Sequence, residues 1–134
     1  MDKTTFVLIK GYIEKAKEKL RTAEKLFAER YYDDAVSRAY YSAFHITQAL
    51  LLTEGLTADS HHGLVILFGL HFIKTGKIAK KFARYLSNLK DDREVSDYEV
   101  FSTIDKETAE KSITEAKEFV EHIITHLQSF LKKR

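Results

Sequence analysis

The sequence predicts an all-α fold, a five-helix up-and-down bundle in a single domain that spans residues 1–134. The first observation is that the chain holds no proline and only five glycines, whereas all-β folds need many turns built from these residues. The second is that apolar residues recur at intervals of three and four over long stretches, as they do in amphipathic α-helices. The third is that a length of 134 residues fits one domain, with no internal repeat to divide it.

The first two helices are predicted from apolar stripes and from residues that begin or end helices. A first helix is expected over residues 5–30, where one stripe is apolar and the opposite face is charged. A second helix is expected over residues 34–53, because Asp33 is a favoured N-cap and Gly55 a favoured stop. The connection between these two helices is therefore predicted to be short.

The remaining helices differ in how much of their surface is apolar. A third should begin after Ser60 and end before Gly76, and its apolar residues lie on almost all sides, which predicts burial. A fourth is expected over residues 78–90. The polar stretch 91–105 has no clear period and is predicted to be the longest connection. Its last residue, an aspartate, should cap a fifth helix over residues 106–132.

The composition excludes several kinds of site. There is no cysteine, which removes disulfides, thiolate nucleophiles and cysteine-based zinc sites. The formal net charge is only +2, so the overall electrostatics does not by itself demand a nucleic-acid partner. No apolar run reaches the roughly 18 residues of a membrane span, and the first residues lack the apolar segment of a signal peptide. We expect a cytoplasmic protein with no membrane contact, no metal site and no cofactor.

A polar stripe runs along the second helix, opposite its apolar face. Arg38 and His45 stand two turns apart on this stripe. Tyr41, Ser42 and Gln48 lie on the same side of the helix. An arginine and a histidine can cap a neighbouring helix or pair with a carboxylate. Alternatively the stripe lines a cleft or subunit interface that handles phosphate, because arginine presents a fork of donors, histidine moves protons near neutral pH and tyrosine stacks on bases.

Three segments together resemble the small stand-alone branch of the HEPN family (higher eukaryotes and prokaryotes nucleotide-binding). They are YYDDAVSRAYYSAFHITQALL at residues 31–51, SHHGLVILFGLHFIKTGKI at 60–78 and LKDDREVSDYEVF at 89–101. The resemblance implies a five-helix bundle, often a homodimer, frequently encoded beside a minimal nucleotidyltransferase as a toxin–antitoxin pair. It also implies a signature for the many members that are metal-independent ribonucleases, an arginine followed after four to six residues by a histidine.

Two places in the chain can be compared with this signature. Arg38 and His45 have six residues between them. By order along the chain, the signature of the toxin members corresponds instead to REVSDY, where Arg93 takes the arginine position and Tyr98 takes that of the histidine. Tyrosine, with a pKa near 10, is a poor general base at neutral pH, although Arg93 can still stabilise phosphate charge. The resemblance therefore favours nucleotide or RNA binding over cleavage.

The stripe and the resemblance together give the candidate site residues. The candidates for nucleotide or RNA binding are Arg38, Tyr41, His45, Arg93, Asp97 and Tyr98. We expect a binding protein that forms a toxin–antitoxin-type pair with a minimal nucleotidyltransferase. One alternative is a ribonuclease that uses Arg38 and His45, or Arg93, as catalytic residues, and another is a purely structural bundle. The second helix, apolar or weakly polar on nearly all sides, is predicted to form the seam of a homodimer.

Three other patterns are interpreted more simply. His61 and His62 are adjacent at a helix start, where a plain capping role is expected, although the backbone amides there could hold an anion. His122 and His126 have a spacing that can hold a metal ion, but without a third ligand they are expected to be two surface histidines. A basic stretch is expected to be a solvated face, although it could follow a phosphate backbone. It comprises Lys74, Lys77, Lys80, Lys81 and Arg84.

Overall fold

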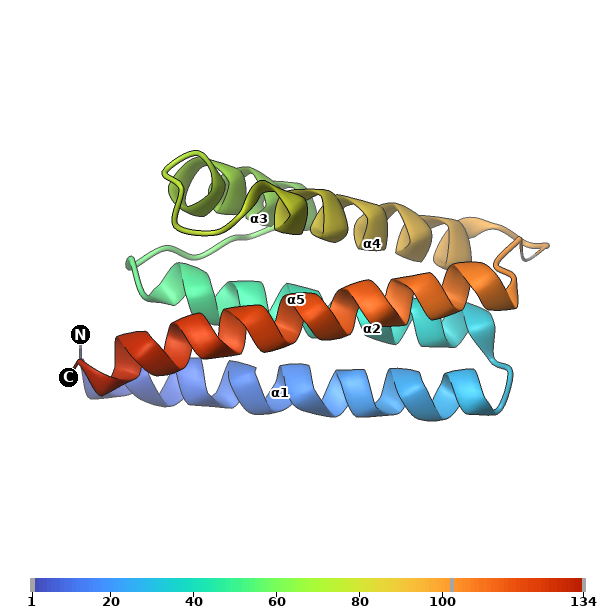
Figure 1. Ribbon diagram of the computed structural model, residues 1–134, viewed down its shortest axis with the longest axis horizontal. Helices are drawn as coiled ribbons and strands as arrows, with labels where there is room; N and C mark the ends of the chain where they lie inside the picture. Colours follow the sequence, from blue (N-terminus) through green and yellow to red (C-terminus); the bar gives the residue numbers. More distant parts are fainter. Residues whose placement is uncertain (1, 102, 134) are drawn as a thin grey trace.

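The computed structural model describes residues 2–101 and 103–133, and these form five α-helices and one short π-helical segment. The helices are α1 (Lys3–Ala28), α2 (Tyr32–Leu52), α3 (His61–Phe68), α4 (Lys80–Tyr98) and α5 (Lys106–Lys132), and the π-helical segment η1 (Gly69–Ile73) follows α3. The four long helices lie roughly alongside one another, and both ends of the chain are at the same end of the bundle (Figure 1). The predicted all-α bundle is therefore confirmed.

The core is built around α2, which packs against α1, α3, α4 and α5. The predicted stripe of α1 is buried against it, from Ile9 to Ala23. Two polar residues of α2, Ser42 and Thr47, are buried as well, and their hydroxyl groups donate to backbone carbonyl oxygens one turn earlier, at 2.7 and 2.8 Å. Because α2 is enclosed by four helices of its own chain, it is not simply an outer seam with a single core face.

Short polar side chains cap the N-termini of three helices, α1, α3 and α5. Asp2 accepts from the backbone of Thr5 at 2.7 Å, and the Ser60 hydroxyl accepts from the backbone of Gly63 at 2.9 Å. Asp105 accepts from the backbone N–H three residues later at 2.8 Å. Each cap satisfies an N–H that the helix leaves without an intrahelical acceptor. The predicted caps Ser60 and Asp105 are thus confirmed.

The start of α2 differs from the prediction. The residue at its N-cap is Tyr31, whose side chain makes no capping hydrogen bond among the described residues, and Asp33 lies within the first turn. The preceding Arg30 has a φ of 69°, and the backbone N–H of Tyr31 donates to the carbonyl of Leu26 at 2.9 Å. The left-handed residue and the bond back into α1 therefore end α1 and set the direction of the turn that leads into α2.

The fourth helix is longer than predicted. It continues through the stretch predicted to be a connection and ends at Tyr98. Two side-chain pairs four residues apart support these extra turns, Lys90 with Glu94 at 2.6 Å and Arg93 with Asp97 at 3.1 Å. The prediction was wrong here because it weighed the missing apolar period and not the ion pairs. The REVSDY segment consequently lies on a helix.

The third helix is less buried than predicted. Leu64, Phe68 and Phe72 are buried, but Ile66 and Leu70 remain exposed. The segment is apolar all round, yet α3 packs chiefly on α2 and α4 and lies at the edge of the bundle (Figure 1). The outer side of α3 is therefore not covered by any described part of the chain.

None of the described helices is both long enough and apolar enough to cross a membrane.

Candidate functional site

The centre of the candidate site is Arg93, a buried arginine of α4 that is only 6% exposed. Its guanidinium carbon lies 5.2 Å from the ring centre of Tyr40, 5.9 Å from that of Tyr41 and 6.0 Å from that of Tyr98. These distances are within the range of cation–π attraction. Two of the rings come from α2 and one from α4, so the site is formed where these helices pack together.

The polar contacts of Arg93 leave part of its guanidinium unused. One terminal nitrogen, Nη1, donates to Asp97 Oδ2 at 3.1 Å. The Nε atom is buried and has no hydrogen-bond partner among the described residues. Burial acts to lower the pKa of Arg93, but the hydrogen bond to Asp97 and the neighbouring Tyr41 outweigh it and raise that pKa. Arg93 is therefore a permanent positive charge, and its Nε–H has no acceptor among the described residues.

The residue Tyr40 connects this arginine to the start of α3. Its hydroxyl oxygen lies 2.6 Å from Nδ1 of His61, and the tyrosine has no exposed surface. Burial raises the pKa of Tyr40 well above its usual value, so its hydroxyl stays protonated. Burial also lowers the pKa of His61, as do the nearby positive charges of Arg93 and Lys90. At neutral pH the pair is thus a neutral phenol and a neutral imidazole.

We refer to this group of side chains as the Arg93 cluster. Its members are Arg93, Asp97 and Tyr98 of α4, Tyr40 and Tyr41 of α2, and His61 of α3. The His61 ring lies 5.9 Å from the ring of Tyr41 and 4.8 Å from that of Phe44, centre to centre. Three helices therefore contribute to one aromatic and cationic cluster, which presents Tyr98 to solvent at 74% exposure.

The predicted site residues are only partly brought together. Arg93 is in contact with Tyr41, Asp97 and Tyr98. His45 adjoins this group through Tyr41, whose ring centre is 6.2 Å away. Arg38 is exposed on α2, and none of the contacts of Arg93 among the described residues involves it.

The His45 side chain occupies a half-buried position between α1 and α2. Its ring stacks on Tyr12 of α1, with the ring centres 6.1 Å apart and the planes 21° from parallel. Its Nδ1 atom is buried with no hydrogen-bond partner among the described residues. Burial, with smaller effects from Lys15 and Lys19, lowers the pKa of His45 to about 4. His45 is therefore neutral at physiological pH and a weak base.

Sequence reasoning missed two members of the cluster. Helical periodicity places Tyr40 on the apolar face of its helix, and His61 was expected only to cap one. The signal that could have found them is in the segments that resemble the HEPN family, where a tyrosine pair at 40 and 41 is followed by the histidine that begins α3. Helical spacing does not show which helices will be neighbours, so this pairing needed the structure.

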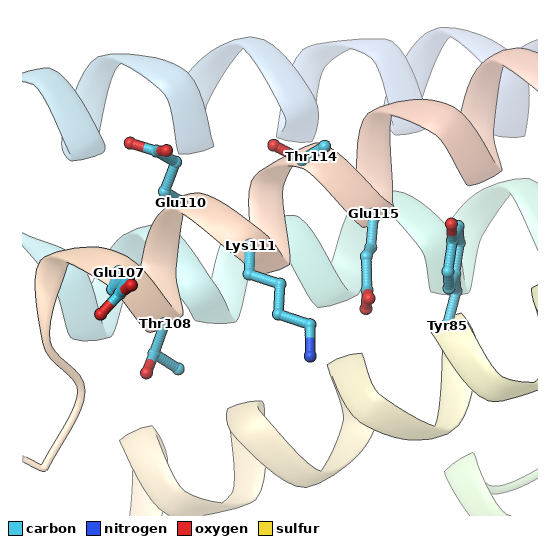
Figure 2. A pocket seen from close by; sticks show the side chains of 7 residues that line it. All are labelled: Tyr85, Glu107, Thr108, Glu110, Lys111, Thr114 and Glu115. Atoms are coloured by element: carbon cyan, nitrogen blue, oxygen red, sulfur yellow. The ribbon is translucent and has the colours of Figure 1, made fainter.

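A cavity away from this cluster lies in the groove between α4 and α5 (Figure 2). It has a volume of about 600 Å³. Its lining residues are Tyr85, Glu107, Thr108, Glu110, Lys111, Thr114 and Glu115. Most of the charged side chains there are carboxylates of α5, so the groove repels phosphate, and it includes no member of the Arg93 cluster.

The basic stretch and the histidine pairs have local partners. Lys77 pairs with Glu54 at 2.7 Å and Lys81 with Glu118 at 2.5 Å, as expected for part of a solvated face. His122 stacks on Phe82 with ring centres 4.3 Å apart. Among the described residues, no group of three or more histidine, cysteine, aspartate or glutamate side chains is placed to hold a metal ion.

Comparisons with known proteins agree with this architecture. A model of the HEPN domain matches residues 9–127. A protein of Methanocaldococcus jannaschii named "Putative toxin MJ0605" is 40% identical over 126 residues, which is 92% of this chain and 91% of that protein. A UPF0332 protein of Thermotoga maritima is 30% identical over 116 residues, 87% of this chain and 88% of that protein.

A solved structure supports the fold independently. The crystal structure of TT1696 from Thermus thermophilus superimposes with a TM-score of 0.73 at 15% sequence identity, and the match covers 87% of this chain and 96% of that one. At that identity the similarity shows the fold and nothing more. The family match over most of the chain, together with the relatives above, leads to one conclusion: the chain belongs to the HEPN domain family.

Proposed function

We propose that this protein binds the phosphate groups of a nucleotide or an RNA at the Arg93 cluster, as a component of a toxin–antitoxin-type pair with a minimal nucleotidyltransferase. Membership of the HEPN family and relatives named as toxins support a toxin-like role. The observation that favours phosphate binding is the unpartnered Nε of buried Arg93. The pairing with a nucleotidyltransferase follows from the family resemblance.

The chemistry of Arg93 suits phosphate. A buried N–H without an acceptor costs about 1–3 kcal/mol, and a phosphate oxygen bound at Nε would remove that cost. The planar guanidinium presents its donors as a fork that matches phosphate geometry, and the tyrosine rings around it hold it in one orientation.

An aromatic surface for a base lies next to the proposed phosphate site. Tyr98 is largely exposed and its ring centre is 6.0 Å from the guanidinium carbon of Arg93. Stacking of a base on such a ring contributes about 1–3 kcal/mol and tolerates any base. The arrangement therefore fits a nucleotide whose phosphate contacts Arg93 while its base covers Tyr98.

Binding is a better match than cleavage. Attack by a ribose 2′-hydroxyl needs a general base whose pKa is near the working pH. Tyr98 occupies the histidine position of the REVSDY signature, and His45, with a pKa of about 4, is too weak a base for efficient proton removal at neutral pH. We therefore expect RNA with intact 2′-hydroxyls to be bound and left uncut.

The decisive experiment compares two arginines. Fluorescence anisotropy with a labelled, 2′-O-methylated RNA measures binding without interference from cleavage. We expect Arg93→Gln to weaken binding by about 1.5–3 kcal/mol, roughly ten- to a hundredfold, because it removes a charge-assisted contact. The matched control, Arg38→Gln, removes the same charge from an exposed position of α2 and should leave affinity within about twofold.

Folding is checked separately for this pair. Thermal unfolding of both variants shows whether Arg93→Gln still forms the bundle, and Arg93→Lys, which keeps the charge but loses the fork, should show an intermediate affinity. Equal losses of affinity in Arg38→Gln and Arg93→Gln would mean that the RNA recognises net charge and not the Arg93 cluster.

A further inference from the structure

His61, the first residue of α3, makes a side-chain hydrogen bond that has no part in capping its helix. His61 Nδ1 lies 2.6 Å from the hydroxyl of Tyr40, a residue of α2 with no exposed surface. The capping of α3 is already provided by Ser60, whose hydroxyl accepts from the backbone of Gly63. The hydrogen bond between Tyr40 and His61 is therefore separate from the cap of α3.

The direction of this hydrogen bond follows from burial. A phenol has one hydrogen to donate, and in the described part of the chain His61 Nδ1 is the acceptor that the Tyr40 hydroxyl reaches. If the imidazole donated instead, the hydrogen of Tyr40 would be left without an acceptor in an interior that water does not reach, at a cost in free energy. Tyr40 therefore donates and Nδ1 accepts.

The direction of the bond fixes the histidine tautomer. A neutral imidazole carries one hydrogen, and when Nδ1 is the acceptor that hydrogen is on Nε2. Burial and the positive charges of Arg93 and Lys90 lower the pKa of His61, which keeps it neutral. His61 is thus locked as an Nε2–H donor that cannot serve as a base at that nitrogen.

We propose that His61, locked in this tautomer by Tyr40, is a second phosphate-binding residue of the Arg93 cluster and donates its Nε2–H to the same phosphodiester. This inference rests on the proposed function. Arg93, which is more than nine-tenths buried with an unpartnered Nε, supplies the charge, and His61 supplies a neutral, directional donor from a different helix. Both residues border the rings of Tyr40 and Tyr41.

A neutral donor makes a distinct prediction about pH. The ionisable groups around His61 are Tyr40 and Tyr41 of α2 and Lys90, Arg93, Glu94 and Asp97 of α4. A phosphodiester keeps one negative charge from about pH 6 to pH 8, where an unshifted histidine would lose its charge. If His61 bound as an imidazolium, affinity would fall across this range. As a neutral donor it should leave the affinity constant to within about twofold.

The first test is independent of RNA. In wild-type protein labelled with ¹⁵N-histidine, long-range ¹H–¹⁵N spectra distinguish a protonated ring nitrogen from an unprotonated one. We expect Nδ1 of His61 unprotonated and Nε2 protonated, and we expect Tyr40→Phe to convert His61 into a mixture of tautomers. An Nδ1–H tautomer in the wild type would overturn the inference while leaving the proposed function of Arg93 intact.

The second test adds RNA that lacks terminal phosphates and is 2′-O-methylated. Its binding should shift the Nε2 resonance of His61. Relative to Tyr40→Phe, the double variant Tyr40→Phe/His61→Leu should bind about three- to tenfold more weakly, the scale of one lost hydrogen bond. Comparing these two variants avoids leaving a buried hydroxyl unpaired. His61→Gln, which restores an N–H donor, should recover most of the affinity, and His62→Gln, a change at the exposed neighbour, should have no effect.

The results separate this inference from the proposed function. If wild-type protein binds RNA and Arg93→Gln does not, but the Nε2 resonance stays fixed and the double variant binds as well as Tyr40→Phe, His61 has no role in binding and the inference is wrong. If wild-type protein does not bind RNA, the role proposed for His61 fails, and if it binds no nucleotide either, the proposed function fails with it.

Discussion

The surroundings of His45 keep its side chain neutral, and this makes the stability of the fold depend on pH. Its ring is half-buried against Tyr12, and its pKa is lowered from 6.5 to about 4. Below about pH 6.5 the unfolded chain takes up a proton at this residue while the folded chain does not. The stability that neutral His45 contributes is therefore present above pH 6.5 and is lost as pH falls from 6.5 toward 4.

A substitution at this position should change the pH dependence of stability. We expect His45→Phe to keep the ring packed on Tyr12, remove the unpartnered Nδ1 and abolish this titration. The advantage of the variant over the wild type in the free energy of unfolding should be about 1–2 kcal/mol larger near pH 4.5 than at neutral pH, should shrink as pH rises from 4.5 to 6.5, and should stay constant above pH 6.5. Urea unfolding across this range measures it, with exposed His62→Gln as the control. A gap that stays constant with pH would contradict the assignment.

The sequence predicted individual site residues unevenly, and the reason is geometric. Arg93, Asp97 and Tyr98 were identified because they stand together in the short REVSDY segment that resembles the family signature. Tyr40 and His61 were not identified as site residues, since they are 21 positions apart and meet only because α2 and α3 pack together. Helical spacing specifies which residues share a face, but not which face of another helix they meet.

At the scale of helices, the sequence predicted that each helix exists but did not predict every helix boundary. All five helices were predicted, and the predicted bounds of α5 agree with the structure, because Asp105 caps a strict apolar repeat. The end of α4 was missed because ion pairs extend it, and the start of α2 was missed because the residue at its N-cap, Tyr31, makes no side-chain capping bond among the described residues. Apolar periodicity therefore predicts the body of a helix better than its boundaries.

The turn between α1 and α2 offers a test of that backbone geometry. Arg30 has a φ of 69°, in the left-handed region that costs a residue with a Cβ about 1–2 kcal/mol. Arg30→Gly should raise the free energy of unfolding by roughly 0.5–1 kcal/mol, since the added freedom of glycine in the unfolded chain offsets part of the relief. The neighbouring Glu29, with a φ of −90°, supplies the control, and Glu29→Gly should bring no gain. Equal effects in urea unfolding would show that left-handed strain is not involved.

At the scale of the whole molecule, an exposed apolar surface adjoins the Arg93 cluster. Val100 and Phe101, which follow the end of α4, are 90% and 85% exposed. We propose that a homodimer covers this surface, in place of the seam along α2 that the sequence suggested, because α2 is already enclosed by its own chain. A twofold contact here would bring two Arg93 clusters near each other.

The dimer is tested with a charge placed on this surface. Sedimentation at micromolar concentration should give wild-type protein at twice the 15.5 kDa chain mass. We expect Val100→Asp to shift the protein to a monomer, because a carboxylate buried in an apolar contact loses its hydration. Val7→Asp adds the same charge to an exposed valine near the start of α1, at the other end of the bundle, and should remain dimeric (Figure 1). A wild-type monomer would refute the dimer.

The placement of the two chain ends has a practical consequence for experiments on this protein. α1 begins and α5 finishes at one end of the bundle, whereas the connection from α4 to α5 lies at the other (Figure 1). An affinity tag or surface anchor fused at either end would therefore leave the connection beside Tyr98 pointing away from the support. Joining the two ends with a short linker and opening the chain within residues 99–105 would give a circular permutant with every helix intact.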